Sequence, residues 1–86
     1  MNLFELQSGE KCLIDKIFVT GSMRRRLLDL GLAPDTKVEC VGQSALGDPK
    51  AFLIRGAVIA IRQETCQKIF IKDVTRWKIK MKTISQ

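Results

Sequence analysis

The stretch SMRRRLLDLGLAPDTKV, residues 22–38, carries the clearest structural signals of the sequence. Ser22 is a residue type that favours the N-cap of a helix, because its hydroxyl can accept a hydrogen bond from a free N–H of the first turn. Met23, Leu27 and Leu30 follow at i, i+4 and i+7, which places them on one apolar stripe. These signals predict a short α-helix from Ser22 to Leu30.

The same stretch predicts where the helix ends. Gly31 stands where a left-handed residue is needed after a helix, and Leu32 can contact Leu27 in the apolar closure of a Schellman motif. Pro34 cannot continue the helix, and Pro34-Asp35 suits the centre of a type I turn. We therefore expect the chain to reverse direction here and to enter a strand.

Outside this stretch, apolar and polar residues alternate in short segments bounded by turn residues. Five such segments are typical of strands, and their ranges are 11–19, 36–41, 50–55, 58–62 and 68–72. The alternation breaks near the end of the first segment, which indicates a bulge or a strand end. The side chains expected to face inward are those of Cys12, Ile14, Thr36, Val38, Cys40, Phe52, Ile54, Ile59, Ile61 and Phe70.

These elements together predict a mainly β fold. An SH3-like barrel of about five strands, with one short α-helix at about 22–30 and a helical turn near 63–67, matches the size of the chain. The 86 residues have room for one domain and a short tail. We assign residues 1–73 to the barrel and residues 74–86 to a basic C-terminal tail.

The tail supplies four of the six net positive charges, so the barrel itself is nearly balanced. Basic and apolar residues alternate in it as Arg76, Trp77, Lys78, Ile79, Lys80, Met81 and Lys82. This period of two predicts an extra strand, either at the barrel edge or paired with a second chain in a homodimer. A basic terminus without such a role fits the same residues equally well.

The composition gives no support to a membrane protein or an enzyme. No apolar run approaches the ~18–20 residues that cross a bilayer. The N-terminus lacks a charged segment followed by an apolar one, so we expect a cytoplasmic protein. The sequence has no histidine, the commonest catalytic base, and no Gly-rich phosphate-binding loop. We therefore expect a protein that acts by binding and not by catalysis.

The three cysteines, Cys12, Cys40 and Cys66, are widely spaced and odd in number, which argues against a disulfide framework. There is no C-x-x-C pair and no histidine to complete a tetrahedral zinc site. We expect small buried thiols.

Several motifs follow one another in a specific order. They are RRLLDLGLAPDTKV at 25–38, LGDP at 46–49, RG at 55–56, AIR at 60–62 and IFI at 69–71. In this order and at these distances they resemble the FeoA family of ferrous-iron transport accessory proteins, over about residues 3–72. Two positions depart from the family pattern. Asp35 stands where the family usually has glycine, and Ala57 replaces a commonly larger residue.

The resemblance implies an SH3-like barrel that acts in the cytoplasm beside FeoB, the membrane transporter of ferrous iron, by binding its cytosolic GTPase domain. It also implies transition-metal binding at the level of the family, and the same barrel occurs in metal-dependent repressors of the DtxR type. The candidate ligands for Fe²⁺ or another divalent transition metal are then Cys12, Cys40 and Cys66, in a site that two chains would share more readily than one chain would form. The partner-binding residues that we expect are Arg25, Leu46, Asp48 and Arg55. For Asp48 the alternative is a structural role, in which its carboxylate accepts backbone N–H bonds and shapes a turn.

Other interpretations stay open for two basic segments. Arg24–Arg26 can simply form a solvated helix face, with Arg26 paired to Asp29 three residues further on. The tail with Trp77 suits base stacking and phosphate contacts, so a small nucleic-acid-binding β-barrel is the alternative function. The chain has no tyrosine and four phenylalanines, of which Phe52 and Phe70 are expected in the core, so few other aromatic rings are free for stacking.

Overall fold

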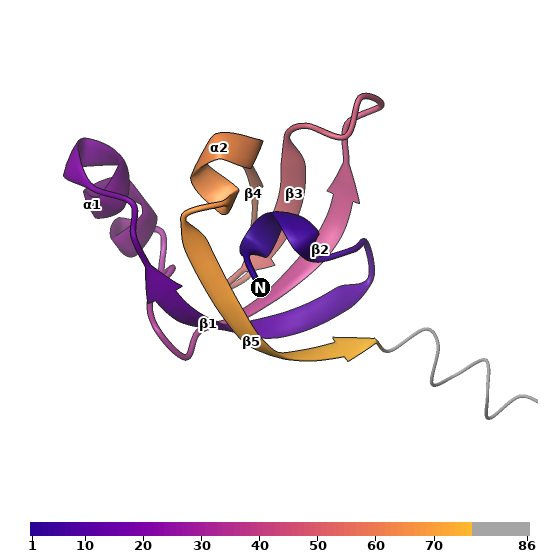
Figure 1. Cartoon of the computed structure of the whole chain (residues 1–86), viewed down its shortest axis with the longest axis horizontal. Coiled ribbons are helices and arrows are strands. Elements are labelled where there is room, and N and C mark those ends of the chain that lie inside the picture. Colours follow the sequence, from indigo (N-terminus) through magenta and orange to yellow (C-terminus); the bar gives the residue numbers. More distant parts are fainter. Residues whose placement is uncertain (77–86) are drawn as a thin grey trace, which may run out of the picture.

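Five strands dominate the structure, a computed structural model that describes residues 1–76 (Figure 1). The strands are β1 (Glu10–Ile17), β2 (Lys37–Gln43), β3 (Lys50–Ile54), β4 (Ala57–Ile61) and β5 (Ile69–Arg76). The helical elements are the 3-10 helix η1 (Leu3–Glu5) and the α-helices α1 (Gly21–Asp29) and α2 (Gln63–Cys66). The predicted mainly β class is confirmed, and α2 is the predicted helical turn.

The strands form one sheet in the order β4-β3-β2-β1-β5, and every neighbouring pair is antiparallel. The sheet curves round on itself, with η1 and α2 over its inner side, whereas α1 stands beside it (Figure 1). The β1–β5 ladder shifts register twice, between Lys11 and Leu13 and between Ile14 and Lys16. Such bulges bend a strand, which lets a five-stranded sheet close around a small core.

The core contains the inward residues of the strands together with Leu3, the first residue of η1, and Leu6, which directly follows it. Its fully buried large side chains are Leu3, Leu6, Ile14, Leu32, Val38, Cys40, Phe52, Ile54, Cys66 and Ile69. The predicted alternation is confirmed in the first four strands, except that Ile59 is only half-buried. Each buried aliphatic or aromatic side chain stabilises the fold by about 1.5–3 kcal/mol relative to its exposed form, so the sheet and η1 depend on one another.

The helix α1 differs from its prediction at its start, and its apolar stripe is only partly buried. It begins at Gly21, after Thr20, and no side chain caps it. The start of the helix is exposed, so water can satisfy its first N–H groups, and Ser22 is not needed there. On the apolar stripe only Leu27 is buried, while Met23 and Leu30 remain 41% and 37% exposed.

The end of α1 is confirmed as a Schellman motif. Gly31 has a φ of 99°, its N–H donates to the Leu28 carbonyl (3.0 Å), and the Leu32 N–H donates to the Leu27 carbonyl (2.9 Å). Leu32 and Leu27 both belong to the core. The turn that follows is closed by a bond from the Thr36 N–H to the Ala33 carbonyl (3.0 Å).

That turn is of type II and not the predicted type I. Asp35 has a φ of 68°, the left-handed conformation that a type II turn requires at its third position. Aspartate tolerates this conformation better than most residues do. Asp35 therefore occupies a left-handed position that glycine would adopt without strain.

The predicted ends of β1 and β5, and the predicted burial of Phe70, also need correction. β1 ends at Ile17, two residues early, and Phe18 is exposed. Phe70 was expected in the core but is 39% exposed, with its ring edge-to-face against Phe18 at 5.5 Å. β5 continues to Arg76, whose backbone pairs with Glu10. The strand predicted for Trp77–Lys82 and the homodimer through it lie outside the described residues.

Candidate partner-binding surface

The four residues expected at a partner-binding rim do not gather in one place. Arg25 lies in a depression beside α1, Asp48 in one beside α2, and Arg55 in one on the outer face of β1, β2 and β3. Leu46 lines none of the depressions described within residues 1–76. The four residues therefore do not form one continuous surface, and each has its own contacts.

Leu46 belongs to the loop between β2 and β3, and it is 95% exposed. The loop projects at the upper right of Figure 1. The loop around it is held by its own hydrogen bonds. The Gly47 N–H donates to the Ser44 carbonyl (2.8 Å), the Ser44 N–H donates to the Pro49 carbonyl (3.1 Å), and the Ser44 hydroxyl donates to the Asp48 carbonyl (2.7 Å). The loop thus presents an apolar side chain to solvent from an ordered base.

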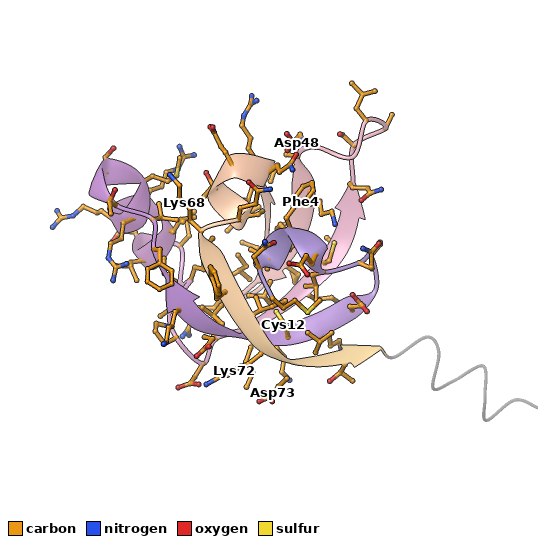
Figure 2. The ribbon with its side chains drawn as sticks, viewed as in Figure 1. Phe4, Cys12, Asp48, Lys68, Lys72 and Asp73 are labelled. Atoms are coloured by element: carbon orange, nitrogen blue, oxygen red, sulfur yellow. The ribbon has the colours of Figure 1, made fainter. Side chains whose placement is uncertain are left out.

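Asp48 has the structural role that was its alternative interpretation. Its Oδ1 accepts a hydrogen bond from the backbone N–H of Gln63 (2.8 Å), the first residue of α2. Figure 2 shows Asp48 close to this helix. A carboxylate at a helix start satisfies a free N–H and is favoured by the positive end of the helix dipole. Asp48 therefore fixes the β2–β3 loop to α2, while its exposed edge stays open to a partner.

Arg55 joins the β3–β4 turn to the end of α1. Its Nε donates to the carbonyl of Gly31 (3.2 Å), which also accepts from the Thr36 hydroxyl (3.2 Å). The arginine stem covers Gly31 so closely that a Cβ added there would lie 2.4 Å from the Arg55 Cδ. Arg55 is thus a structural residue that completes the end of the helix, where carbonyl groups favour a cation.

Among the arginines of α1, the structure fixes Arg24. Its Nη1 donates to the Ile17 carbonyl (2.9 Å) and ties the helix to the end of β1. An ion pair joins Lys72 to Asp35 (2.7 Å), whereas Arg26 and Asp29, both described, do not form the pair that their spacing suggested. The hydrogen bond to Asp35 is also the main cause that raises the pKa of Lys72.

The three cysteines are buried free thiols, as expected. Burial is the largest cause that raises the pKa of Cys12 and of Cys66 to about 12, and it also raises the pKa of Cys40. The Sγ atoms of Cys40 and Cys66 point at the backbone carbonyls of Gly42 (3.7 Å) and Ile61 (3.6 Å).

A cysteine binds a metal ion as its thiolate, and burial disfavours the thiolate form of these three side chains. Within residues 1–76 no three cysteine or carboxylate side chains are grouped so that they could hold a metal ion. The three thiols of one copy therefore do not fit a metal centre.

Lys50 is a structural residue that the sequence reasoning missed. Although charged, it is buried, and its Nζ donates to the carbonyls of Phe4 (2.6 Å) and Leu6 (3.0 Å). The ammonium also lies 4.7 Å from the centre of the Phe4 ring. The available signal was its register, because Lys50, Phe52 and Ile54 alternate on the inward face of β3.

A groove between α1 and β4 was also missed. It has a volume of about 240 Å³ and is lined by Met23, Arg26, Leu27 and Leu30 of α1 and by Ile59, Ala60, Ile61, Arg62, Glu64 and Thr65 of the β4–α2 segment. The exposed part of the α1 stripe forms one wall of this groove. The amphipathic period predicted the apolar stripe of α1. It could not show that Met23 and Leu30 on this stripe line an open groove and are not packed against the barrel.

Comparison with known proteins identifies relatives of this chain. The FeoA domain matches residues 1–73. The solution structure of FeoA from Chlorobium tepidum is 30% identical, with a TM-score of 0.79 over 83% of this chain and 68% of that one. An iron(II) transport protein A from Clostridium thermocellum is 28% identical, with a TM-score of 0.79, over 84% of this chain and 44% of that one. No curated protein sequence matches the chain.

A third structure shows the fold alone at lower identity. It is FeoA from Stenotrophomonas maltophilia, described as an SH3 domain protein complexed with zinc, with 20% identity and a TM-score of 0.77 over 88% of this chain and 96% of that one. The predicted SH3-like fold is thereby confirmed. None of the helices within residues 1–76 is long and apolar enough to span a membrane. With a domain match over most of its length and a solved relative at 30% identity, the chain belongs to the FeoA family.

Proposed function

We propose that this protein is a cytoplasmic accessory protein of ferrous iron transport, which acts by docking on the cytosolic GTPase domain of a FeoB-like transporter. The match of the FeoA domain to residues 1–73 carries the proposal. Docking is recognition between surfaces, so it needs no catalytic group and no metal held within the chain. The finer assignment of the partner follows from the family resemblance of the motifs.

Leu46 is the residue that supports docking most directly. A leucine that is 95% exposed on an ordered loop is poised to be buried by a partner. Full burial of such a side chain contributes about 1.5–3 kcal/mol, or roughly a tenfold to hundredfold gain in affinity. The bond between Asp48 and the Gln63 N–H keeps the loop in position, so little ordering is required on binding.

The test is the affinity of the purified GTPase domain for this protein, measured by calorimetry with and without guanine nucleotide. We expect Leu46→Ala to weaken binding about tenfold or more, because it removes most of the buried apolar area. Val41→Ala is the matched control, since Val41 is an exposed apolar residue on the neighbouring strand. Absence of binding by the unchanged protein in every nucleotide state would reject the docking proposal.

A second candidate function is nucleic-acid binding, and one observation favours it. Phe18 and Phe70, which are 58% and 39% exposed, lie together beside the exposed residues Lys16 and Lys68. Exposed rings next to basic side chains are the elements of a single-strand binding surface. Filter binding of a single-stranded oligonucleotide should then weaken steeply as salt rises, and Phe18→Ala should abolish it. Retention that is weak and insensitive to salt would exclude this function.

A further inference from the structure

The two edges of the sheet differ. β5, at one edge, is covered along its first half by the N-terminal segment: Asn2 bridges to Phe70, and the Ile71 N–H donates to the Met1 carbonyl (2.9 Å). β4, at the other edge, pairs with β3 alone. Its sequence, AVIAI, contains no charged residue and no proline, which are the usual means by which proteins protect an edge strand.

The register identifies the backbone groups that β4 leaves open. Arg55 and Gly56 both have positive φ, 48° and 84°, so they form the two-residue type I′ turn of the β3–β4 hairpin. The residues that flank such a turn, Ile54 and Ala57, are a hydrogen-bonded pair, and the pairs alternate from there. Residues 57, 59 and 61 therefore bond to β3, while Val58 and Ala60 direct their N–H and carbonyl groups away from the sheet. Within residues 1–76 no backbone bond from another segment reaches these two residues.

The groove beside α1 runs along this open edge. Its lining includes Ile59 and Ile61, which point inward, and also Ala60, which points to the opposite face. Consecutive strand residues whose side chains alternate between the two faces can all line one space where that space borders the strand's edge, because the backbone is reached there. Across the groove, Met23 and Leu30 of α1 supply an apolar wall. An open edge and an unfilled apolar wall thus face the same space.

Size and charge decide what can fill this space. About 240 Å³ is below the roughly 300–1,000 Å³ of sites for drug-sized ligands, but it can hold a few side chains of an extended peptide. A whole second copy of the domain would have to fit past α1 to reach the edge. The charged residues of the groove are two arginines, Arg26 and Arg62, and one carboxylate, Glu64, so the groove favours carboxylates in its ligand.

We propose that β4 accepts an added strand from a partner protein: an extended peptide segment with alternating apolar residues and acidic residues at one end, which lies between β4 and α1. The segment forms backbone hydrogen bonds with Val58 and Ala60, places apolar side chains against Met23, Leu30 and Ile59, and pairs its carboxylates with Arg26 and Arg62. Strand addition beside a helix obtains affinity from main-chain bonds and specificity from the flanking wall. The inference rests on the proposed function only in that the partner is a protein.

The first experiment uses two blocked nonapeptides of alternating valine and threonine, one with two glutamates at its end and one with two lysines in their place. The ¹⁵N-labelled full chain is titrated to about 1 mM peptide, which detects even millimolar affinity. We expect amide shifts at β4 and α1, slower hydrogen exchange at Val58 and Ala60, and about tenfold tighter binding of the glutamate peptide. Absence of shifts, or shifts confined to the Leu46 loop or to the depression around Arg55 on the outer face of β1, β2 and β3, would overturn the proposal.

The second experiment changes the edge itself. Ala60→Pro removes only an outward N–H, so the β3–β4 hairpin should persist while glutamate-peptide binding falls at least about tenfold. Ala60→Thr keeps the N–H and should bind within about twofold of the unchanged protein. Continued protection of the amides of residues 57, 59 and 61 verifies that the hairpin is intact.

Two variants in α1 keep the proposal testable if the proline unfolds the hairpin. Leu30→Glu puts a carboxylate in the groove and should weaken the glutamate peptide about tenfold. Leu28→Glu, on another side of the same helix and similarly exposed, should not. An equal loss of peptide affinity in the two variants would reject the groove as the binding site. Slow exchange at Val58 and Ala60 in the protein alone, rising with its concentration, would also reject it, because a second copy would then occupy the edge.

The peptide experiments contain no GTPase domain, so their failure leaves the docking proposal untouched. Conversely, binding of the peptide to β4 does not require that the GTPase domain be the natural partner. If the GTPase domain binds the Ala60→Pro variant as tightly as the unchanged protein, docking stands and strand addition is excluded as its mode.

Discussion

Gly31 is subject to two constraints that different parts of the chain impose. Its φ of 99° follows from the Schellman ending of α1, and its missing side chain leaves room for the Arg55 stem. We expect Gly31→Ala to lower the free energy of unfolding by about 2 kcal/mol or more, because a left-handed alanine costs roughly 1–2 kcal/mol and Arg55 must also move. Urea unfolding followed by circular dichroism measures this loss.

A double-mutant cycle separates the two constraints. With Arg55→Ala in place, Gly31→Ala should cost about 1 kcal/mol less, since the clash is gone while the left-handed conformation remains. Additive losses would show that the arginine stem does not constrain Gly31.

Lys50 holds η1 to the sheet, and its removal should leave two carbonyl groups without a donor. We expect Lys50→Met, which keeps the length of the side chain, to destabilise the fold by about 1–3 kcal/mol. Lys68→Met is the control, because Lys68 is exposed and should change stability by no more than about 0.5 kcal/mol. A Lys50→Met protein as stable as the original would mean that water satisfies both carbonyls.

The residues that the sequence predicted correctly are those whose signals are local. Gly31 and Leu32 were predicted because helix-stop signals lie within a few residues of one another. The roles of Lys50 and Arg55 were not, since the partners of these side chains lie 46 and 24 residues away in the chain. Asp48 falls between these cases: a carboxylate that shapes its loop was foreseen, but its acceptor role toward Gln63 depends on where α2 packs.

Among the elements, α1 shows that a periodic pattern does not reveal what a helix contacts. Its spacing of Met23, Leu27 and Leu30 predicted one apolar stripe, yet of the three only Leu27 reaches the core. We expect Leu27→Ala to cost about 2–5 kcal/mol, as truncation of a buried leucine does, and Leu30→Ala about 0.5 kcal/mol or less. Thermal unfolding of the two variants provides the comparison. Similar losses at both positions would mean that Leu30 is packed in solution and that the groove is closed.

Strand lengths were harder to predict than strand existence. The alternation located all five strands, because period two is a strong local signal. The end of β1 and the extension of β5 to Arg76 were missed, since each depends on pairing with a strand far along the chain.

Across the whole molecule, the buried thiols link stability to pH. Because burial raises the pKa of Cys12 and Cys66 to about 12, the folded protein keeps their protons above pH 9, where the unfolded chain releases them. The unfolded state then binds fewer protons, so the free energy of unfolding falls as pH rises, by up to about 1.4 kcal/mol per pH unit for each thiol. Urea midpoints between pH 8 and pH 10.5 should show the decline.

A variant with Cys12, Cys40 and Cys66 changed to alanine provides the control for this pH dependence. It should be less stable at neutral pH but flatter between pH 9 and 10.5 than the original protein. An equally steep decline in the triple variant would assign the effect to lysine residues. The same protonation predicts that the native protein reacts slowly with thiol reagents at pH 8 and quickly once unfolded.

The unequal edges of the sheet also limit how copies of this protein can assemble. Endless head-to-tail growth through strand pairing requires every molecule to offer two open edges, one for each neighbour. Here the N-terminal residues Met1 and Asn2 occupy the first half of the β5 edge, which leaves β4 as the exposed template. Strand pairing between copies through that half of β5 is therefore blocked, so the first two residues of the chain shorten the edge that a neighbouring copy could use for head-to-tail growth.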